Sequence, residues 1–286
     1  MAARKNGLSP DTAPDVALRH IVTSCHVDLS KYRTVALESR RPIGIHQTRV
    51  AFRRMRAAFS VFRDAVNGPD VRSLSAEAKW LAGECAPSRD LHVFLTETVE
   101  DVPPTVSRIA ARLAAVHLQR ARAALSGARF TAFDRQLAAF AAQPPSGRNS
   151  RLEDFGREVL DKRHRKVERR GDGLAHLDVE ELHELRIAIK KQRYAATFLQ
   201  PAFASAATKP YIEATVRLQG ALGALNDRAV AARMLDDIAT AARPTEDVAG
   251  SLKALTKQAG SGDKRRRRKL EGAWKDFKNT ERFWLA

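Results

Sequence analysis

The sequence has few of the residues that cross-link small folds through disulfides, form β-strands or make up membrane-spanning segments. Its 286 residues include two cysteines, Cys25 and Cys85, which form no CxxC motif. They exclude a disulfide framework, fit a reducing cytoplasm, and are expected to be small buried side chains. The N-terminal MAARKNGLSPDTAPD has no apolar segment after its charges, and the longest charge-free run, Tyr194–Thr208, contains Pro201. The sequence therefore predicts a cytoplasmic protein without a signal peptide or a membrane span.

Strand signals are also nearly absent, because no alternation of Val, Ile, Thr and aromatic residues persists. Ala, Leu, Arg, Glu, Gln and Lys fill long stretches at helical spacing, which predicts an all-α fold. Helix breaks are expected at the Pro and Gly clusters, including one at Pro210. The PPSG segment at mid-chain predicts a linker over residues 144–150, between halves 13–143 and 151–286, with a flexible N-terminus over residues 1–12.

Positive charge is abundant and evenly spread. Fifty Lys and Arg face 33 Asp and Glu, a formal charge of +17, of which residues 1–143 carry +8 and residues 144–286 carry +9. With 44% hydrophobic residues the chain has enough apolar content for a packed core. A body this basic predicts a polyanionic partner, which could be nucleic acid, an anionic membrane surface or polyphosphate.

The two halves repeat one another. Residues 45–64 read IHQTRVAFRRMRAAFSVFRD and residues 182–201 read LHELRIAIKKQRYAATFLQP. An offset of 137 places His46 on His183 and Arg49 on Arg186, and it still holds far downstream, where Asp90 falls on Asp227. One register kept across more than 40 residues indicates an internal duplication.

On a helical wheel each copy has a basic stripe opposite an apolar arc. The stripe residues of the two copies are His46, Arg49, Arg53 and Arg56, and His183, Arg186, Lys190 and Arg193. Arg54 and Lys191 lie about 80° from the two histidines and point away from the stripes. Like charges one turn apart weaken a helix, so the stripes predict a bound anion. Arg offers a planar fork for phosphate, and His adds a pH-tunable donor. The alternative is that these cations are only solvated and the histidines lie in the interior.

These motifs resemble the conserved histidine α-helical domain, CHAD. The resemblance rests on HxxRVxxRRxR in residues 46–56, the Ser88-Arg89-Asp90 turn and HxLRIxxKKxRY in residues 183–194, and it extends from about Ala13 to the C-terminus. It implies two pseudo-symmetric four-helix bundles with a basic groove or pore between or across them. It also implies binding of inorganic polyphosphate and association with polyphosphate granules.

The resemblance carries specific residues over to a ligand-facing set. That set is His46, Arg49, Arg53, Arg56, His183, Arg186, Lys190 and Arg193, with Arg54 and Lys191 as second candidates. Arg89, Asp90, Asn226 and Asp227 are expected to support them, with the two aspartates orienting arginines or capping a helix. The second half departs from the first, because Asn226 stands at the position of Arg89 and Gln192 at that of Met55. The second half is therefore expected to bind the ligand less tightly.

Other chemistry has little support. His183 begins a false HExxH, because Ile187 stands where the second metal ligand is needed, and the remaining histidines lack ligand spacing. P-loop, GxSxG and GxGxxG motifs are absent, as is the ExExK motif of the catalytic CYTH domains that accompany some CHAD domains. No metal or cofactor is expected. The tryptophans are assigned to packing. Arg163 and its basic neighbours in residues 162–170 are assigned mostly to the surface, with a minority lining the groove.

The predicted function is therefore non-catalytic binding of inorganic polyphosphate. A nucleic-acid-binding protein is the first alternative, favoured by the run KRRRRK at residues 264–269 and disfavoured by the lack of aromatic residues among the stripe cations. That run is expected to begin a helix, either solvated or reaching the polyanion. A phosphohydrolase or a phosphotransferase with His46 or His183 as phospho-acceptor is the last alternative, since it lacks an acidic metal cluster.

Overall fold

The computed structural model describes residues 7–39, 41–66, 68–144, 150–203, 205–259 and 263–285, without the side chains of residues 226–229 and 263. Within these residues eleven α-helices and no strand form, which confirms the all-α prediction. The helices are α1 (Pro14–Glu38), α2 (Pro42–Val61), α3 (Pro69–Glu84), α4 (Ala86–Val93), α5 (Pro104–Ser126), α6 (Ala128–Ala142), α7 (Leu152–Arg170), α8 (Val179–Leu199), α9 (Thr208–Ala241), α10 (Ala249–Ala259) and α11 (Asp263–Asn279).

Local signals set most helix starts. Helices α1, α2, α3 and α5 begin at a proline, whose fixed φ and missing N–H suit the first helical position. Helix α8 begins with a capping box in which Asp178 and Glu181 each accept a hydrogen bond from the other's backbone N–H. The break expected at Pro210 lies just before it, because α9 begins at Thr208 and Pro210 falls in the first turn, where a proline is tolerated.

The repeat extends to the helix boundaries. The offset of 137 carries residues 42–61 onto residues 179–198, and α8 spans Val179–Leu199. Helix α1 corresponds to α7 in the same register. The halves differ after that, because α3 and α4 are separated at Cys85, whereas the 34-residue α9 runs through both corresponding segments.

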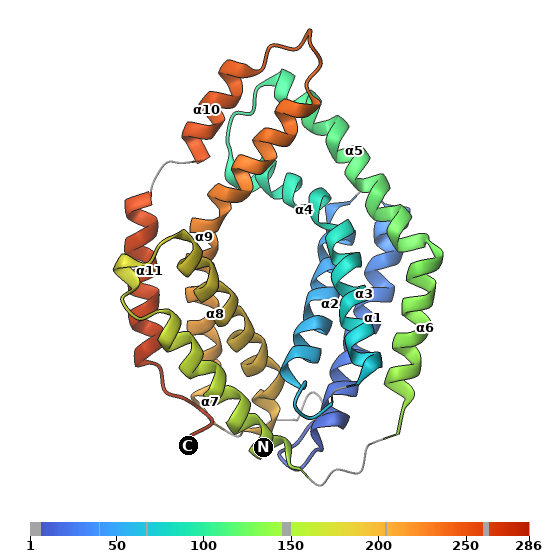
Figure 1. Cartoon of the computed structure of the whole chain (residues 1–286), viewed down its shortest axis with the longest axis vertical. Helices are drawn as coiled ribbons and strands as arrows, with labels where there is room; N and C mark the ends of the chain where they lie inside the picture. Colours follow the sequence, from blue (N-terminus) through green and yellow to red (C-terminus); the bar gives the residue numbers. More distant parts are fainter. Residues whose placement is uncertain are drawn as a thin grey trace.

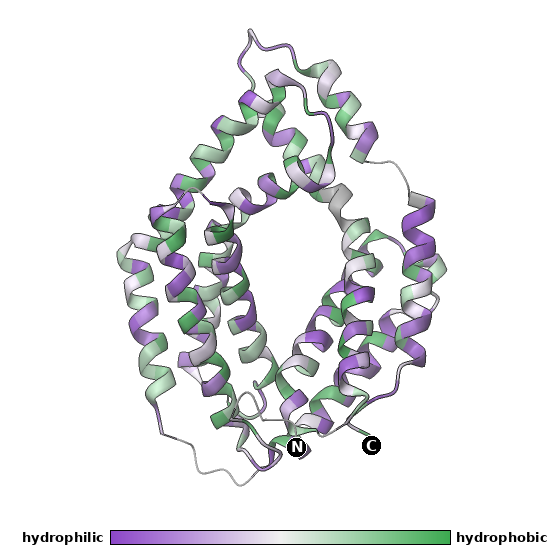
Figure 2. Cartoon of the chain, turned by 180° about the vertical axis from the view of Figure 1, so that it is seen from behind, coloured by the Kyte–Doolittle hydropathy of each residue, from purple (hydrophilic) through white to green (hydrophobic). Residues whose placement is uncertain are grey.

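Helices α2 and α8 face each other across the centre of the molecule and converge at their C-terminal ends (Figure 1). Helices α1 and α3 lie beside α2, with α6 packed against α1 and α3, and α7 and α9 lie beside α8, with α11 packed against α9. The other end is closed by α4, α10 and the ends of α5 and α9. Hydrophilic residues dominate the first turns of the outer helix α11 (Figure 2), where the KRRRRK run begins a helix as predicted.

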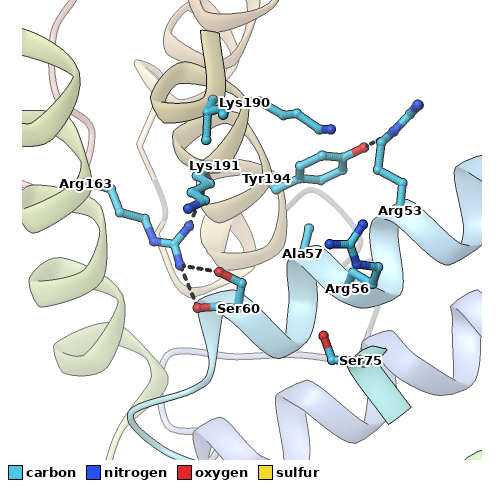
Figure 3. A pocket seen from close by; sticks show the side chains of 10 residues that line it. Arg53, Arg56, Ala57, Ser60, Ser75, Arg163, Lys190, Lys191 and Tyr194 are labelled. Carbon is cyan, nitrogen blue, oxygen red and sulfur yellow. Dashed lines mark hydrogen bonds between the residues drawn. The ribbon is translucent and has the colours of Figure 1, made fainter. Parts of the chain in front are cut away.

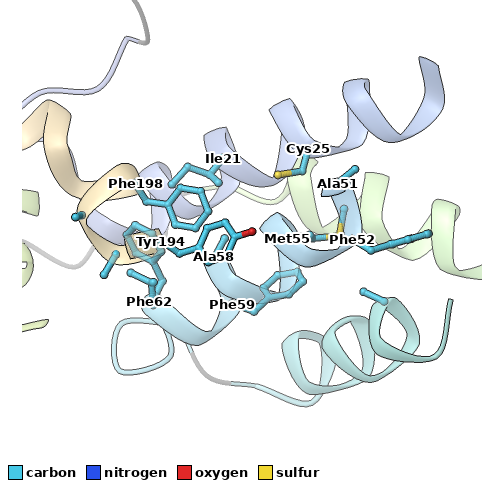
Figure 4. Packing of buried hydrophobic residues seen from close by; sticks show 14 of the residues in the cluster. Ile21, Cys25, Ala51, Phe52, Met55, Ala58, Phe59, Phe62, Tyr194 and Phe198 are labelled. Carbon is cyan, nitrogen blue, oxygen red and sulfur yellow. The ribbon is translucent and has the colours of Figure 1, made fainter. Parts of the chain in front are cut away.

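Two buried clusters stabilise this arrangement, and both draw on the two halves of the chain. The larger one joins them where the ring of Phe62 stacks on that of Phe155, with centroids 5.4 Å apart. Figure 4 shows Phe62 of α2's end beside Tyr194 and Phe198 of α8. The smaller cluster forms at the far end, between α4, α5, α9 and α10.

The cysteines and tryptophans lie in or against this core. Cys25 and Cys85 are fully buried, as predicted, and burial raises their thiol pKa values to about 11 and about 12. Trp284 is fully buried, while Trp80 and Trp274 pack against the core from partly buried positions.

The expected flexible N-terminus, residues 1–12, is packed over the part that the structure describes. Leu8 is buried in the core, and the carbonyls of Pro10 and Thr12 accept hydrogen bonds from the first backbone N–H groups of α7. These N–H groups have no partner inside their own helix, so the incoming chain satisfies them. Residues 1–6, and residues 145–149 of the expected linker, lie outside the described part.

Two glycines permit close approaches that set helix positions. A Cβ on Gly44 would lie 2.6 Å from the backbone nitrogen of Ala36, so glycine lets α2 fold back against α1. A Cβ on Gly171 would overlap the ring of Trp274, which covers the end of α7 from α11.

Candidate functional site

The basic stripes of α2 and α8 meet at a cavity of about 360 Å³, near the point where the two helices converge. Four predicted site residues line it, and Figure 3 shows them approaching from both helices. They are Arg53, Arg56, Lys190 and Lys191. Ala57, Ser60, Ser75, Arg163, Ile187 and Tyr194 complete the lining. Repeated helices therefore place cations from distant parts of the sequence around one space.

Lys190 lies at the centre of this charge. Burial and then the neighbouring charges of Arg53, Arg186, Arg56 and Arg193 lower its pKa to about 8. We call these five residues the cation cluster. Within the described part of the chain Lys190 has no ion pair and no hydrogen bond. A charged amine held among four guanidinium groups without a carboxylate is electrostatically unfavourable, and an anion in the cavity would relieve that repulsion.

Two arginines of the cation cluster have hydrogen-bond donors without a partner. The Nε atoms of Arg56 and Arg186 are buried and have no hydrogen-bond partner among the described atoms. Burial lowers the pKa of Arg56. A buried donor without a partner costs about 1–3 kcal/mol, and more when it is charged. These N–H groups therefore favour an acceptor that the protein itself does not supply.

Tyr194 links the two stripes. Its hydroxyl oxygen lies 2.8 Å from Nε of Arg53, which donates to it across the junction of α2 and α8. The guanidinium of Arg193 lies over the same ring, 4.6 Å from its centroid, and its Nε donates to Gln219. Phe198 stacks on Tyr194 as well, and Tyr194 is only 5% exposed. The ring therefore positions two arginines and has no free face for a base.

The first-repeat end of the site is held by side chains of α4. Arg49 donates to the carbonyl of Ala86 at 2.9 Å and to Asp90 at 3.0 Å, so this aspartate orients an arginine. Arg89 donates from Nε to Nδ1 of His46 at 2.8 Å and also reaches Glu97. Burial and then the charges of Arg89, Arg53 and Arg49 lower the pKa of His46. His46 is therefore neutral with its proton on Nε2, which leaves that N–H as a donor.

The second-repeat end is more open. His183 is exposed and makes no hydrogen bond among the described residues. Asn226 and Asp227, the expected counterparts of Arg89 and Asp90, fall on α9, but their side chains lie outside the described part. Gln192 is fully buried, where its amide donates to the carbonyl of Leu160 and to the hydroxyl of Tyr211. It belongs to the core of the second half and does not face the cavity.

Arg54 and Lys191, the second candidates for the ligand-facing set, lie in different places. Lys191 lines the cavity, whereas Arg54 turns toward α1 and forms an ion pair with Asp28 at 2.8 Å. The run at residues 264–269 also lies away from the cavity, on α11, where Arg267 donates to the carbonyl of Ala175.

Arg163 is a cavity residue that the sequence did not single out from its basic neighbours. It reaches from α7 and donates to the carbonyl of Ser60 at 2.7 Å and to that of Lys191 at 3.2 Å. Burial lowers its pKa to about 10. Its role depends on α7 lying against the ends of α2 and α8, and within a run of basic residues no sequence signal distinguished it.

No group of three or more His, Cys, Asp or Glu side chains suited to a metal occurs among the described residues. In the same part of the chain, none of the helices combines the length and apolar character that a bilayer crossing requires.

Fold and site define a class of protein: an all-helical chain in which two repeated helices bring like charges to one cavity. The chain belongs to the CHAD domain family, which matches residues 20–236. The crystal structure of the CHAD domain from the plant Ricinus communis is similar over 96% of this chain and 95% of that one, with a TM-score of 0.83 at 24% identity. PptA from Streptomyces chartreusis has a TM-score of 0.62 at 14% identity, covering 96% of this chain and all of that one. A search of curated proteins found no match.

Proposed function

We propose that this protein binds inorganic polyphosphate in the basic site between α2 and α8, without catalysis. The observation that carries the proposal is the cation cluster, in which Lys190 is surrounded by four arginines and no described carboxylate pairs with it. A linear chain of phosphates offers one negative charge after another to such a group of cations. Arg forks and the Nε2–H of His46 are suited to its oxygens.

In this proposal the halves 13–143 and 151–286 act as one unit. Each contributes a helical bundle, and the basic groove between them holds the polyphosphate. Fixed and unpartnered donors from both α2 and α8 would contact the same chain. Association with polyphosphate granules in the cytoplasm follows from the same chemistry.

Nucleic acid is the second candidate, because the run at residues 264–269 presents exposed cations on the outside of α11. Tyr194 argues against it at the cavity, since Phe198 and Arg193 already cover its ring. Single-stranded nucleic acid is held largely by stacking on exposed aromatic rings.

Titration of long-chain polyphosphate, single-stranded DNA and double-stranded DNA at one salt concentration tests the proposal. We expect polyphosphate to bind most tightly, with a logarithmic salt slope of about 3.5 if the five cluster cations each neutralise one phosphate. Nucleic acid binding as tightly as polyphosphate would overturn it. Time-dependent release of phosphate would show catalysis instead.

A further inference from the structure

Lys191 and Arg54 occupy equivalent positions of the repeat, yet their surroundings differ. Arg54 is neutralised by Asp28 and lines a small pocket of about 130 Å³ beside α1. Lys191 lines the cavity between α2 and α8, on the side of α7, and has no ion pair among the described residues. Burial and then the charges of Lys166, Arg163 and Arg63 lower the pKa of Lys191, which places these cations close to it.

The cations beyond Lys191 form a surface patch. We define the α7 patch as Arg63, Lys162 and Lys166, all of which are exposed. Asp64 lies 3.7 Å from Arg63 and 3.8 Å from Lys162, and within the described chain it supplies the patch's only ion pairs. One carboxylate facing three cations leaves the patch positive.

The equivalent positions beside α1 are neutral or paired. His26, at the position of Arg163, lies 2.7 Å from a carboxylate oxygen of Asp134. Leu29 and Gln200 stand at the positions of Lys166 and Arg63. The duplication has therefore kept cations on the α7 side and lost or paired them on the α1 side.

Arg163 connects the cavity with the α7 patch. Its guanidinium lines the cavity, and its hydrogen bonds to the carbonyls of Ser60 and Lys191 fix it at the boundary between α2, α7 and α8 (Figure 3). The cavity itself, about 360 Å³, has the volume of roughly a dozen water molecules. It has room for a short stretch of phosphates, so a long chain must emerge from it.

We propose that a long polyphosphate chain leaves the cavity on the α7 side, past Arg163 and Lys191 and over the α7 patch, and not on the α1 side. This inference rests on the proposed function and adds a direction to it. The chain would follow the excess of positive charge on the α7 side, since the equivalent positions on the α1 side are neutral or paired.

Chain length provides the test. The double variant Arg63→Glu with Lys166→Glu changes only exposed side chains, so the fold should persist. We expect its affinity for long-chain polyphosphate to fall at least tenfold and its salt slope to fall by about 1.4, or 0.7 for each lost phosphate contact. Tripolyphosphate, measured by competition, should bind within twofold of the wild type, because it fits within the cavity.

The matched control is Lys253→Glu with Lys257→Glu on α10, which changes the net charge equally at exposed positions far from the cavity. Equal losses in the two double variants would show a net-charge effect and overturn the exit. Unchanged binding of the long chain by the α7-patch variant would overturn it too. Wild-type protein that binds neither phosphate ligand would instead refute the proposed function.

A second pair of variants compares the two sides directly. Lys191→Gln should weaken long-chain binding several-fold, whereas Arg54→Gln should leave it within twofold. Equal effects at the two positions would contradict a preferred side. Thermal unfolding of each variant separates loss of binding from loss of fold.

Discussion

The two repeated helices carry the same kinds of cation but hold them differently. On α2, Arg49 is fixed by Asp90 and His46 by Arg89. On α8, the Nε of Arg186 and the amine of Lys190 have no partner among the described residues. His46 and Arg49 are thus preorganised by the protein, whereas Arg186 and Lys190, like Nε of Arg56 on α2, remain available to a ligand. Cations that the protein already holds lose less conformational freedom when a ligand binds, whereas the unpartnered ones gain new hydrogen bonds.

The largest effect should come from reversing the unpartnered charges of α8. The double variant Arg186→Glu with Lys190→Glu should lose polyphosphate affinity at least a hundredfold, because two charge-assisted hydrogen bonds contribute about 1.5–3 kcal/mol each. Equilibrium titration at fixed salt measures it, with Lys253→Glu and Lys257→Glu as the charge-matched control. A loss below tenfold would show that α8 does not hold the ligand.

The next prediction concerns stability, where the two copies should respond with opposite signs. Arg49→Met should lower the free energy of unfolding by about 1–3 kcal/mol, because Asp90 and the carbonyl of Ala86 lose their donor. Lys190→Met should raise it at neutral pH, because a charge repelled by four arginines is removed. Urea unfolding of the unliganded variants measures both. Equal destabilisation by the two variants would show that Arg49 and Lys190 do not differ in this way.

The pH dependence of Lys190 sharpens the same comparison. Its folded-state pKa of about 8 lies below the ordinary value of 10.5, so the charged form is penalised only in the folded protein. Stability of the free protein should therefore rise between about pH 8 and pH 10.5, relative to Lys190→Met. Binding should change in the opposite direction, because phosphate favours the charged amine.

We expect polyphosphate affinity to fall by up to about tenfold for each pH unit above 8, as one proton must be taken up on binding. Lys190→Arg stays charged and should flatten this profile. A wild-type profile that is already flat from pH 7 to 9 would show that Lys190 is not at the ligand.

The sequence predicted those features that depend on one helix at a time. Helical spacing placed Arg53, Arg56, Lys190 and Arg193 on single faces, and the repeat indicated that the faces are related. What it could not supply was the neighbour of each side chain. Arg54 and Lys191 are equivalent in the sequence, but an aspartate on α1 pairs with one and further cations surround the other.

Arg163 and Tyr194 show the same limit. Arg163 lies within a run of basic residues, and only the approach of α7 to the ends of α2 and α8 makes it part of the cavity. Tyr194 belongs to the recognisable motif, but its contact with Arg53 joins two helices that are far apart in sequence. Residue types and periodicity carry no information about such distant pairs.

Among the variants expected to weaken binding, Tyr194→Phe should have the smallest effect, and it tests how far the two stripes depend on each other. It removes the oxygen that accepts from Arg53 and keeps the ring beneath Arg193. A single hydrogen bond to a charged group contributes about 1.5–3 kcal/mol, but Arg53 can find phosphate oxygens once the ligand is present. We therefore expect a few-fold loss of polyphosphate affinity with an unchanged salt slope, since no cation is lost. A slope reduced by about 0.7 would mean that Arg53 contacts phosphate only when Tyr194 holds it, so that the α2 stripe is positioned by α8.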